Sequence, residues 1–278
     1  MIIKVNGGLS ILTAFINGHG SAVSINLPMY TEINESDIDY FENKEINDTV
    51  NFIRKKYNIN KNYNIKIKSE IPMAMGLKSS SAMTLSLIYG IIKMNGINIH
   101  ERDLLRITAK ASIYNKTSIT GAMDDIASCY YGGLCITDNN KNKLLARNKI
   151  KDNYLLIAYN DNIRKTYDYK NYDFTVYRKF YKNIEKLLNE NFVYEAMVLN
   201  GYLFSMIFGY NSDVINYFLK NRAAYAGQSG KGPAFFSIYN SWKDMDYAYN
   251  NFKFDNYKLI KSRFNNEGIN IMDNGNQD

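Results

Sequence analysis

The sequence predicts an α+β fold in two parts, residues 1–150 and 151–278. Predicted strands and helices come in mixed order, without the strict strand–helix–strand repetition of a parallel sheet. A chain of 278 residues, 46% of them hydrophobic, is long enough to bury a substantial core in one large domain or two moderate ones. The pattern of elements changes near residue 150, although no Pro- or Ser-rich linker marks the boundary.

The first part combines strands with helices. A helix is predicted over 48–57, with Val50 and Ile53 on one face and Asp48 as the expected N-cap. The apolar run 83–94 predicts a helix that is buried on most sides. A further helix is expected over 101–114. The strands predicted from β-branched, aromatic and alternating residues are 2–5, 11–16, 21–33, 63–68 and 134–137.

The second part repeats this mixture with longer helices. A glycine-rich turn at 227–233 precedes a strand, and a polar tail follows from Asn274. The expected strands are 154–159, 234–239 and 256–261. The expected helices are 173–189, 191–208, 213–221 and 242–251.

The formal net charge is +7, from 34 basic and 27 acidic residues. Such an excess suits anionic partners such as nucleotides, phosphorylated metabolites, nucleic acid or membrane surfaces. The basic residues are scattered, however, which is typical of an ordinary solvated surface. Aromatic residues alternate with lysines over 167–181, and we interpret them as core and surface positions of one helix. No nucleic-acid partner is therefore expected.

Cys129 and Cys135 form no C-x-x-C pair, and His19 and His100 lie far apart, so a zinc site has little support. A chain of this length with only two cysteines suggests a protein of a reducing compartment, and an isolated disulfide between the two is the alternative. No stretch of 18 apolar residues and no signal peptide is present, so we expect a cytoplasmic protein without a membrane span.

Residues 72–82, PMAMGLKSSSA, are the most informative segment. They join a predicted strand to the buried helix, where free backbone N–H groups and the helix dipole suit a phosphate. Gly76 permits close backbone approach, Lys78 adds a positive charge, and the serine hydroxyls can donate hydrogen bonds or ligate a metal. The alternative is that the serines only cap a core helix. The segment is not a Walker A loop, which ends in Gly-Lys-Ser/Thr.

Two further segments contain residues that could take part in ligand binding or catalysis. Residues 227–233, GQSGKGP, suggest a second close approach of backbone to ligand or to the first loop, or else an ordinary turn. Asp124 and Asp125 follow a Thr-Gly turn at an expected helix start. An aspartate there can cap the helix, or it can orient and deprotonate an attacking hydroxyl in phosphoryl transfer.

In this order, the three segments resemble the GHMP kinases, the superfamily of galactokinase, homoserine kinase and mevalonate kinase. The superfamily motif P-x-x-x-G-L-x-S-S-S/A-A is matched over 72–82, and its carboxy-terminal glycine motif over 227–233. The sequence is most similar to archaeal shikimate kinases, with G-L-K-S-S-S-A at 76–82, T-G-A-x-D-D at 120–125 and S-G-x-G-P-A at 229–234. The amino-terminal stretches 8–11 and 18–22 resemble that family more loosely.

The resemblance implies an N-terminal α+β domain and a ferredoxin-like C-terminal domain, with substrates in the cleft between them. It implies ATP-dependent phosphorylation of shikimate to shikimate 3-phosphate, with Mg²⁺ assisted by the Ser80 hydroxyl. Asp124 or Asp125 would act on the acceptor hydroxyl, and Lys78 would neutralise the moving phosphoryl. The residues implied to contact the nucleotide are Pro72, Met73, Ala74, Met75, Gly76, Leu77, Lys78, Ser79, Ser80, Ser81, Ala82 and Gly230.

Several alternatives stay open. Counting back from Gly132 favours Asp125 as the catalytic acid, whereas counting forward from Gly121 favours Asp124. The sequence has Thr13 where the family usually has Asn, and Lys110 where relatives place a magnesium-binding Glu. Homoserine or mevalonate are alternative acceptors, and a non-catalytic ligand-binding protein is the second class of function.

Overall fold

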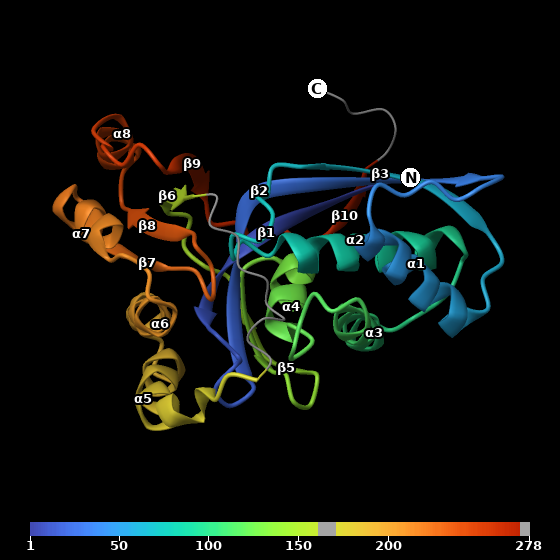
Figure 1. The fold of residues 1–278 in the computed structure, drawn as a ribbon, viewed down its shortest axis with the longest axis horizontal. Helices are drawn as coiled ribbons and strands as arrows, with labels where there is room; N and C mark the ends of the chain where they lie inside the picture. The colour runs from blue at the N-terminus through green and yellow to red at the C-terminus, as the bar shows by residue number, and fades with distance from the viewer. Residues whose placement is uncertain (161–170, 273–278) are drawn as a thin grey trace.

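The computed structural model describes residues 1–160 and 171–272, which form an α+β fold around two antiparallel sheets (Figure 1). The predicted fold class is confirmed. The larger sheet contains the strands β1 (Ile2–Leu12), β2 (His19–Ser36), β3 (Asn62–Ser69), β4 (Leu134–Asp138), β5 (Lys143–Asn148) and β10 (Asn270–Met272). The smaller sheet contains β6 (Tyr154–Tyr159), β7 (Tyr225–Gln228), β8 (Phe235–Tyr239) and β9 (Lys258–Arg263).

The long strand β2 organises the larger sheet. It pairs with β1 along one edge, while β4 and β3 pair with the beginning and the end of its other edge. The sheet continues from β4 to β5 and from β1 to β10, so the last described strand returns to the sheet that contains the first. The register shift between Asn6 and Gly8 places the extra residues on β2, and the shift between Ser10 and Leu12 places one extra residue on β1. Such bulges bend the strand that carries them and change the direction of its side chains.

Four helices cover one face of the larger sheet (Figure 1). Helix α2 is buried on nearly all sides, as its apolar sequence predicted, and it packs between its neighbours and β1. The main hydrophobic core contains residues of both sheets, such as Leu9 and Ile157, together with Leu77 from the loop before α2 and Phe204 from a helix of the second half of the chain. The four helices are α1 (Lys44–Tyr57), α2 (Ser79–Met94), α3 (Glu101–Tyr114) and α4 (Met123–Tyr131).

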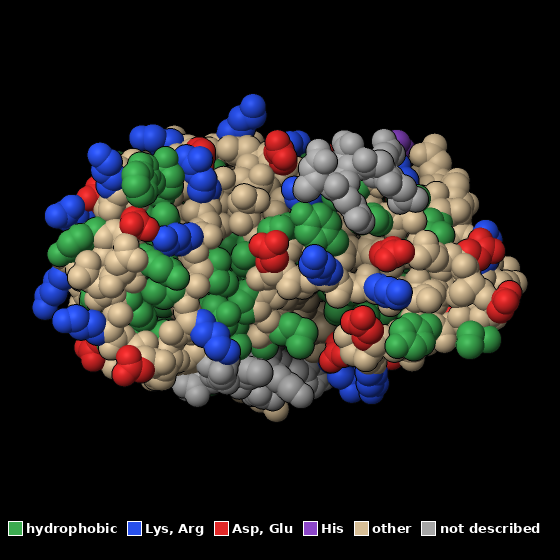
Figure 2. Space-filling model, turned by 90° about the horizontal axis from the view of Figure 1, so that it is seen from above, with side chains coloured by type: hydrophobic (Ala, Val, Ile, Leu, Met, Phe, Trp, Pro, Cys, Tyr) green, Lys and Arg blue, Asp and Glu red, His purple; other side chains and the backbone are tan. Residues whose placement is uncertain are grey.

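The smaller sheet has the order β7-β8-β6-β9 and is accompanied by four more helices and a 3-10 helix. The turn between β7 and β8 reaches β1 in the middle of the molecule (Figure 1). Lysine and arginine side chains surround the end formed by this sheet in Figure 2. The helical segments are Phe174–Tyr177 (3-10), α5 (Arg178–Asn189), α6 (Val193–Phe208), α7 (Asp213–Lys220) and α8 (Trp242–Asn250).

Two local predictions are wrong. The strand expected over 11–16 ends at Leu12, because the chain turns at 13–18 and the Gly18 amide donates to the Ala14 carbonyl at 2.9 Å. Helix α1 begins at Lys44, four residues before the expected cap. Asn43 caps it, since its extended backbone lets the side-chain oxygen accept from the Ile46 amide at 2.9 Å. Asp48 therefore lies inside the helix.

Cys129 and Cys135 are free and buried, so the isolated disulfide is excluded for this pair. Burial raises the pKa of both thiols. In the described part of the chain, no helix is long and apolar enough to span a bilayer. The interpretation of the lysine- and aromatic-rich stretch as one helix is wrong for its described part, because Phe174–Tyr177 form a 3-10 helix and α5 begins only at Arg178. Residues 167–170 and the tail from Asn274 lie outside the described residues.

Candidate active site

Helix α2 begins without a side-chain cap. Its N-cap residue is Lys78, in the left-handed conformation with φ 71°, and no side chain accepts from the first-turn amides. The hydroxyls of Ser79, Ser80 and Ser81 form no hydrogen bond with any described residue. The alternative that these serines cap the helix is therefore wrong. Uncapped amides at the positive end of a helix dipole form a site for an anion.

The side chains of the segment 72–82 have two different surroundings. Met75, Leu77 and Ala82 are buried in the hydrophobic core, so only their backbone can face a ligand. Ser80 is half-buried, and Met73 is exposed. Of the predicted nucleotide contacts, the structure thus leaves the backbone of the loop, the serine hydroxyls and Lys78 to bind an anion.

The glycine-rich turn between β7 and β8 packs directly on this loop. The Ser229 hydroxyl donates to the Gly76 carbonyl at 2.8 Å, and the Ala234 amide donates to the Met75 carbonyl at 3.1 Å. Gly76 has φ 81°, and a Cβ there would lie 2.5 Å from the Ser229 carbonyl oxygen. Only glycine fits both the conformation and the contact. The prediction that the second loop approaches the first is confirmed.

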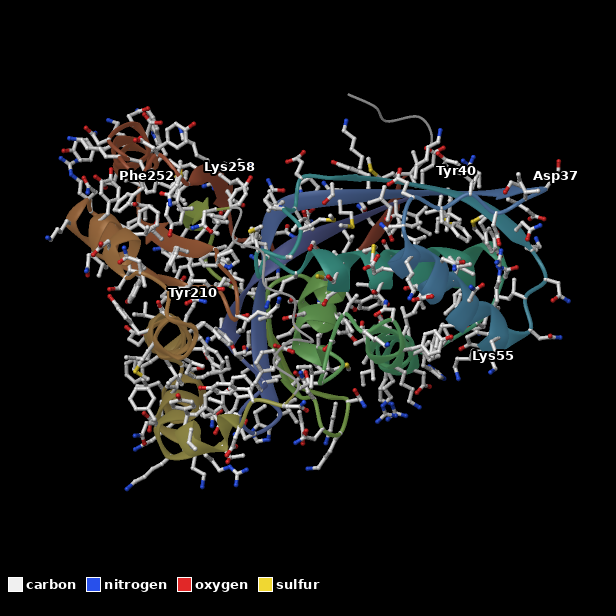
Figure 3. The ribbon with its side chains drawn as sticks, in the orientation of Figure 1. Asp37, Tyr40, Lys55, Tyr210, Phe252 and Lys258 are labelled. Carbon is white, nitrogen blue, oxygen red and sulfur yellow. The ribbon has the colours of Figure 1, made fainter. Side chains whose placement is uncertain are left out.

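Tyr210 fixes the turn from the other side. It lies between α6 and α7 (Figure 3), and its hydroxyl donates to the Lys231 carbonyl at 2.9 Å. Gly230, predicted to contact nucleotide, lies against β1: a Cβ there would be 2.7 Å from the Ser10 hydroxyl oxygen. The turn is thus held between the smaller sheet and β1.

Lys78 extends from the loop to the start of α4. Its ammonium nitrogen lies 2.7 Å from Oδ1 of Asp125, and it also donates to the Ser10 hydroxyl. The Lys78 side chain passes over Gly8, where an added Cβ would lie 3.3 Å from its Cγ. With only 7% of its side chain exposed, the lysine is held in one place beside the serine loop.

The two adjacent aspartates face different surroundings. They are in the first turn of α4, where consecutive side chains point about 100° apart. Neither is the N-cap of the helix, because Ala122 occupies that position and both aspartates lie inside α4. The Asp125 carboxylate is 20% exposed and paired with Lys78, whereas Asp124 is only 5% exposed.

Asp124 is enclosed by β2 and the segment after β4. Asn139 donates to Asp124 Oδ1 at 2.8 Å, and the Asn139 side-chain oxygen accepts from the Thr137 hydroxyl at 2.6 Å. A Cβ on Gly20 would lie 2.6 Å from the Asp124 carboxyl carbon, so glycine is required there. Burial and the neighbouring Asp125 charge raise the pKa of Asp124 to about 7.

Thr13 is fixed by helices of the second half of the chain. Its amide donates to Asn200 Oδ1 at 3.1 Å, and Asn200 Nδ2 donates to its hydroxyl at 3.2 Å. The buried Tyr181 hydroxyl donates to the Thr13 and His19 carbonyls. Sequence reasoning missed Asn200, Tyr181 and Asn139, because their partners are remote in sequence and no local pattern marks them.

The metal-binding capacity of the site is small. Among the described residues, no group of three or more His, Cys, Asp or Glu side chains is arranged to hold a metal ion. Lys110 is exposed on α3 and takes no part in the site. The unpartnered Ser80 hydroxyl fits a single ligand to an ion that arrives with nucleotide phosphates, since Mg²⁺ commonly keeps several waters and few protein ligands.

These features can position a phosphorylated ligand against a carboxylate, and comparisons with known proteins agree with this chemistry. Residues 44–133 match the family described as "GHMP kinases N terminal domain". The structure is similar to the mevalonate kinase of Methanococcus jannaschii, with a TM-score of 0.73, 17% identity, and coverage of 95% of this chain and 98% of that one. The fold is that of the GHMP kinases.

Two relatives make the family assignment of this chain more specific. The shikimate kinase of Thermoplasma acidophilum is 33% identical over 96% of this chain and 96% of its own length. The shikimate kinase of Pyrococcus furiosus is 29% identical over 84% of this chain and 90% of its own length. The chain belongs to the archaeal-type shikimate kinase family within the GHMP superfamily, and is a small-molecule kinase that uses ATP.

Proposed function

We propose that the chain transfers the γ-phosphoryl group of ATP to the 3-hydroxyl of shikimate, giving shikimate 3-phosphate and ADP. The ion pair of Lys78 with Asp125 beside the uncapped start of α2 carries this proposal. It brings a cation and a partly exposed carboxylate to the place where an anion can bind. Phosphoryl transfer needs such positioning and charge neutralisation more than covalent chemistry.

The serine loop would hold the triphosphate. The first amides of α2 and the hydroxyls of Ser79, Ser80 and Ser81 would donate to phosphate oxygens. Mg²⁺ would be held by ATP and by the Ser80 hydroxyl, and it would supply charge neutralisation on the phosphates. Met75 and Leu77 anchor the loop in the core, which keeps its backbone in place as the ligand binds.

Asp125 would act on the acceptor. The shikimate hydroxyl oxygen forms a bond to the γ-phosphorus, the bond from that phosphorus to the β-phosphate bridging oxygen breaks, and the hydroxyl proton passes to the Asp125 carboxylate. Lys78 neutralises charge on the transferred phosphoryl group. Asp124 is too enclosed for this role, since Asn139 and Gly20 lie against its carboxyl group. We therefore assign the acceptor proton to Asp125.

The acceptor is tested by measuring ADP release from ATP with shikimate, homoserine and mevalonate side by side. We expect turnover with shikimate at a kcat/KM at least about 100-fold above that with the other two, because a site built to hydrogen-bond one polyol leaves buried polar groups unpaired with another. Preferential turnover of homoserine or mevalonate would reassign the acceptor. ATP binding without ADP release on any acceptor would indicate a non-catalytic binding protein.

A further inference from the structure

Lys78 and Gly76, two residues apart in the phosphate loop, are connected through two other segments of the chain. Lys78 donates to the Ser10 hydroxyl on β1, and the Ser10 amide donates to the Ser229 hydroxyl at 3.2 Å. The Ser229 hydroxyl in turn donates to the Gly76 carbonyl at 2.8 Å. Ser10 is 3% exposed and Ser229 is fully buried. This closed path joins the loop, the N-terminal strand and the β7–β8 turn.

We propose that Ser10 and Ser229 are positioning residues for phosphoryl transfer, and that they act on different steps. This inference rests on the proposed function. Ser10 fixes the ammonium group of Lys78, and Ser229 fixes the backbone of the phosphate loop. The two serines thus link the smaller sheet to the reacting groups without themselves touching the reacting atoms.

The role of Ser10 follows from the geometry of the ammonium group. A lysine ammonium has three N–H donors and rotates freely unless its partners fix it. Ser10 and Asp125 occupy two of the directions around Nζ, which leaves the third for the transferred phosphoryl group. Without the Ser10 oxygen, Lys78 keeps its charge and its pairing with Asp125 but loses this orientation. The transfer step should therefore suffer more than nucleotide binding.

The role of Ser229 follows from the polarity of the loop. A backbone carbonyl turned toward a triphosphate would repel it, whereas N–H groups attract it. The Ser229 hydroxyl holds the Gly76 carbonyl on the side of the β7–β8 turn, where Ser229 lies directly against Gly76. Loss of this hydrogen bond should weaken nucleotide binding more than it slows transfer.

The test compares Ser10→Ala and Ser229→Ala with Ser237→Ala. Ser237 is a matched control, because it is also fully buried and its hydroxyl donates to the Leu156 carbonyl, away from Lys78. We expect Ser10→Ala to lower kcat about 10- to 100-fold with KM for ATP changed less than about 3-fold, given the usual worth of a hydrogen bond to a charged group. Ser229→Ala should raise KM for ATP about 10-fold. Ser237→Ala should change neither by more than about 2-fold.

A double-mutant cycle separates positioning from general damage. If Ser10 acts through Lys78, then Ser10→Ala should have almost no further effect on kcat in a Lys78→Met background. An equal loss in both backgrounds, or equal losses for Ser10→Ala and Ser237→Ala, would overturn the proposal. Ser10→Thr, which keeps the oxygen, should retain most of the activity, and the similarly sized Ser10→Cys should resemble alanine. These two variants provide the comparison if alanine does not fold.

A measurement without turnover distinguishes this proposal from the proposed function. In the protein labelled with ¹⁵N-lysine, the ammonium signal absent from Lys78→Met identifies Lys78. We expect Ser10→Ala to shift that signal or speed its hydrogen exchange, and Ser237→Ala to leave it unchanged. An unchanged Lys78 signal in Ser10→Ala contradicts the inference even if shikimate is phosphorylated. If the wild-type protein does not turn over shikimate but the Lys78 signal still changes in Ser10→Ala, only the acceptor assignment is contradicted.

Discussion

Helices α2 and α4 begin in the same unusual way but carry opposite charge. Each N-cap residue is left-handed, Lys78 with φ 71° and Ala122 with φ 50°, and neither helix has a side-chain cap. The first turn of α2 contains no acidic residue, whereas that of α4 contains Asp124 and Asp125. By contrast, Asn43 and Ser241 cap α1 and α8 in the ordinary manner. Helices α3, α5, α6 and α7 also lack a side-chain cap, so among the described helices it is the left-handed N-cap residue that distinguishes α2 and α4.

The comparison shows how one backbone arrangement serves two chemical purposes. Free amides with neutral hydroxyls suit an anion, so α2 can hold phosphates. The positive end of α4 favours a negative charge, so the partly exposed Asp125 carboxylate suits a hydroxyl donor or a cation. For Asp124, burial outweighs this effect and raises the pKa. Lys78 belongs to the first helix start and pairs with the second at 2.7 Å, which fixes the distance between them.

The largest expected effect comes from removing the charge of Asp125. Asp125→Asn keeps the size of the side chain but removes the proton acceptor and the partner of Lys78. We expect kcat to fall roughly 100- to 10,000-fold, the usual range for a general base. The measurement is ADP release at saturating ATP and shikimate. Asp124→Asn is the matched comparison and should lose much less; if it loses more, the two roles are reversed.

The two ends of α2 provide the next comparison. Gly76→Ala places a Cβ 2.5 Å from the Ser229 carbonyl oxygen at φ 81°, whereas Gly96→Ala, at φ 64°, meets nothing within 4 Å. Both substitutions carry the conformational cost of a left-handed residue, about 1 kcal/mol, but only the first adds a clash with backbone. Thermal unfolding should show Gly76→Ala destabilised by roughly 2 kcal/mol more than Gly96→Ala. Equal destabilisation would mean that the two loops separate easily.

The sequence predicted the chemistry of the phosphate loop better than the contacts that hold the loop in place. The motif 72–82 located the anion site because local backbone geometry follows from Gly76 and from the apolar helix after it. The Asp pair was found as well, but its two members could be distinguished only by what surrounds them. Asn139 and Gly20 enclose one, and Lys78 pairs with the other.

The missed features depend on long-range contacts. Ser10, separated from Ser229 by 219 positions, and Thr13, separated from Asn200 by 187, meet only once both sheets have formed. The fold class followed from the order of elements, but β5, β7 and β10 were not predicted. Strands β7 and β10 have only four and three residues, and β5 is an edge strand without a buried residue, so none of them has a strong apolar pattern. The domain boundary near residue 150 stays a prediction.

The pH dependence of stability should distinguish the two aspartates further. The pKa of Asp124 is raised from 3.8 to about 7, so the folded protein keeps a proton that the unfolded chain has lost. The associated stability is present below about pH 4 and is lost as pH rises to about 7. Asparagine does not titrate, so the Asp124→Asn variant does not lose this stability as the pH rises. Relative to wild type, its free energy of unfolding, followed through its melting temperature, should therefore rise between pH 4 and pH 7 and then stay level. The expected difference in the free energy of unfolding is on the order of 1–3 kcal/mol.

Asp138→Asn is the control of opposite sign. Asp138 is equally buried, at 5% exposure. Burial alone would raise the pKa of Asp138, but its hydrogen bonds with Lys141 outweigh burial and lower that pKa. Its contribution to stability is present above the unfolded value of 3.8 and is lost as pH falls through the lowered pKa. If both variants shift the stability profile in the same direction, the environment described for Asp124 is wrong.

The smallest expected effect concerns the metal and isolates one hydroxyl at the start of α2. Ser80 is half-buried, whereas Ser79 and Ser81 are 8% and 6% exposed, so Ser80 has the most room for a hydrated ion. Ser80→Ala should raise the Mg²⁺ concentration for half-maximal turnover about 10-fold, as expected for one lost ligand among several waters and phosphate oxygens. At saturating Mg²⁺, kcat should fall less than about 3-fold. A larger shift in Ser79→Ala or Ser81→Ala would move the ligand to that serine, and no shift in any of the three would leave the ion to the triphosphate alone.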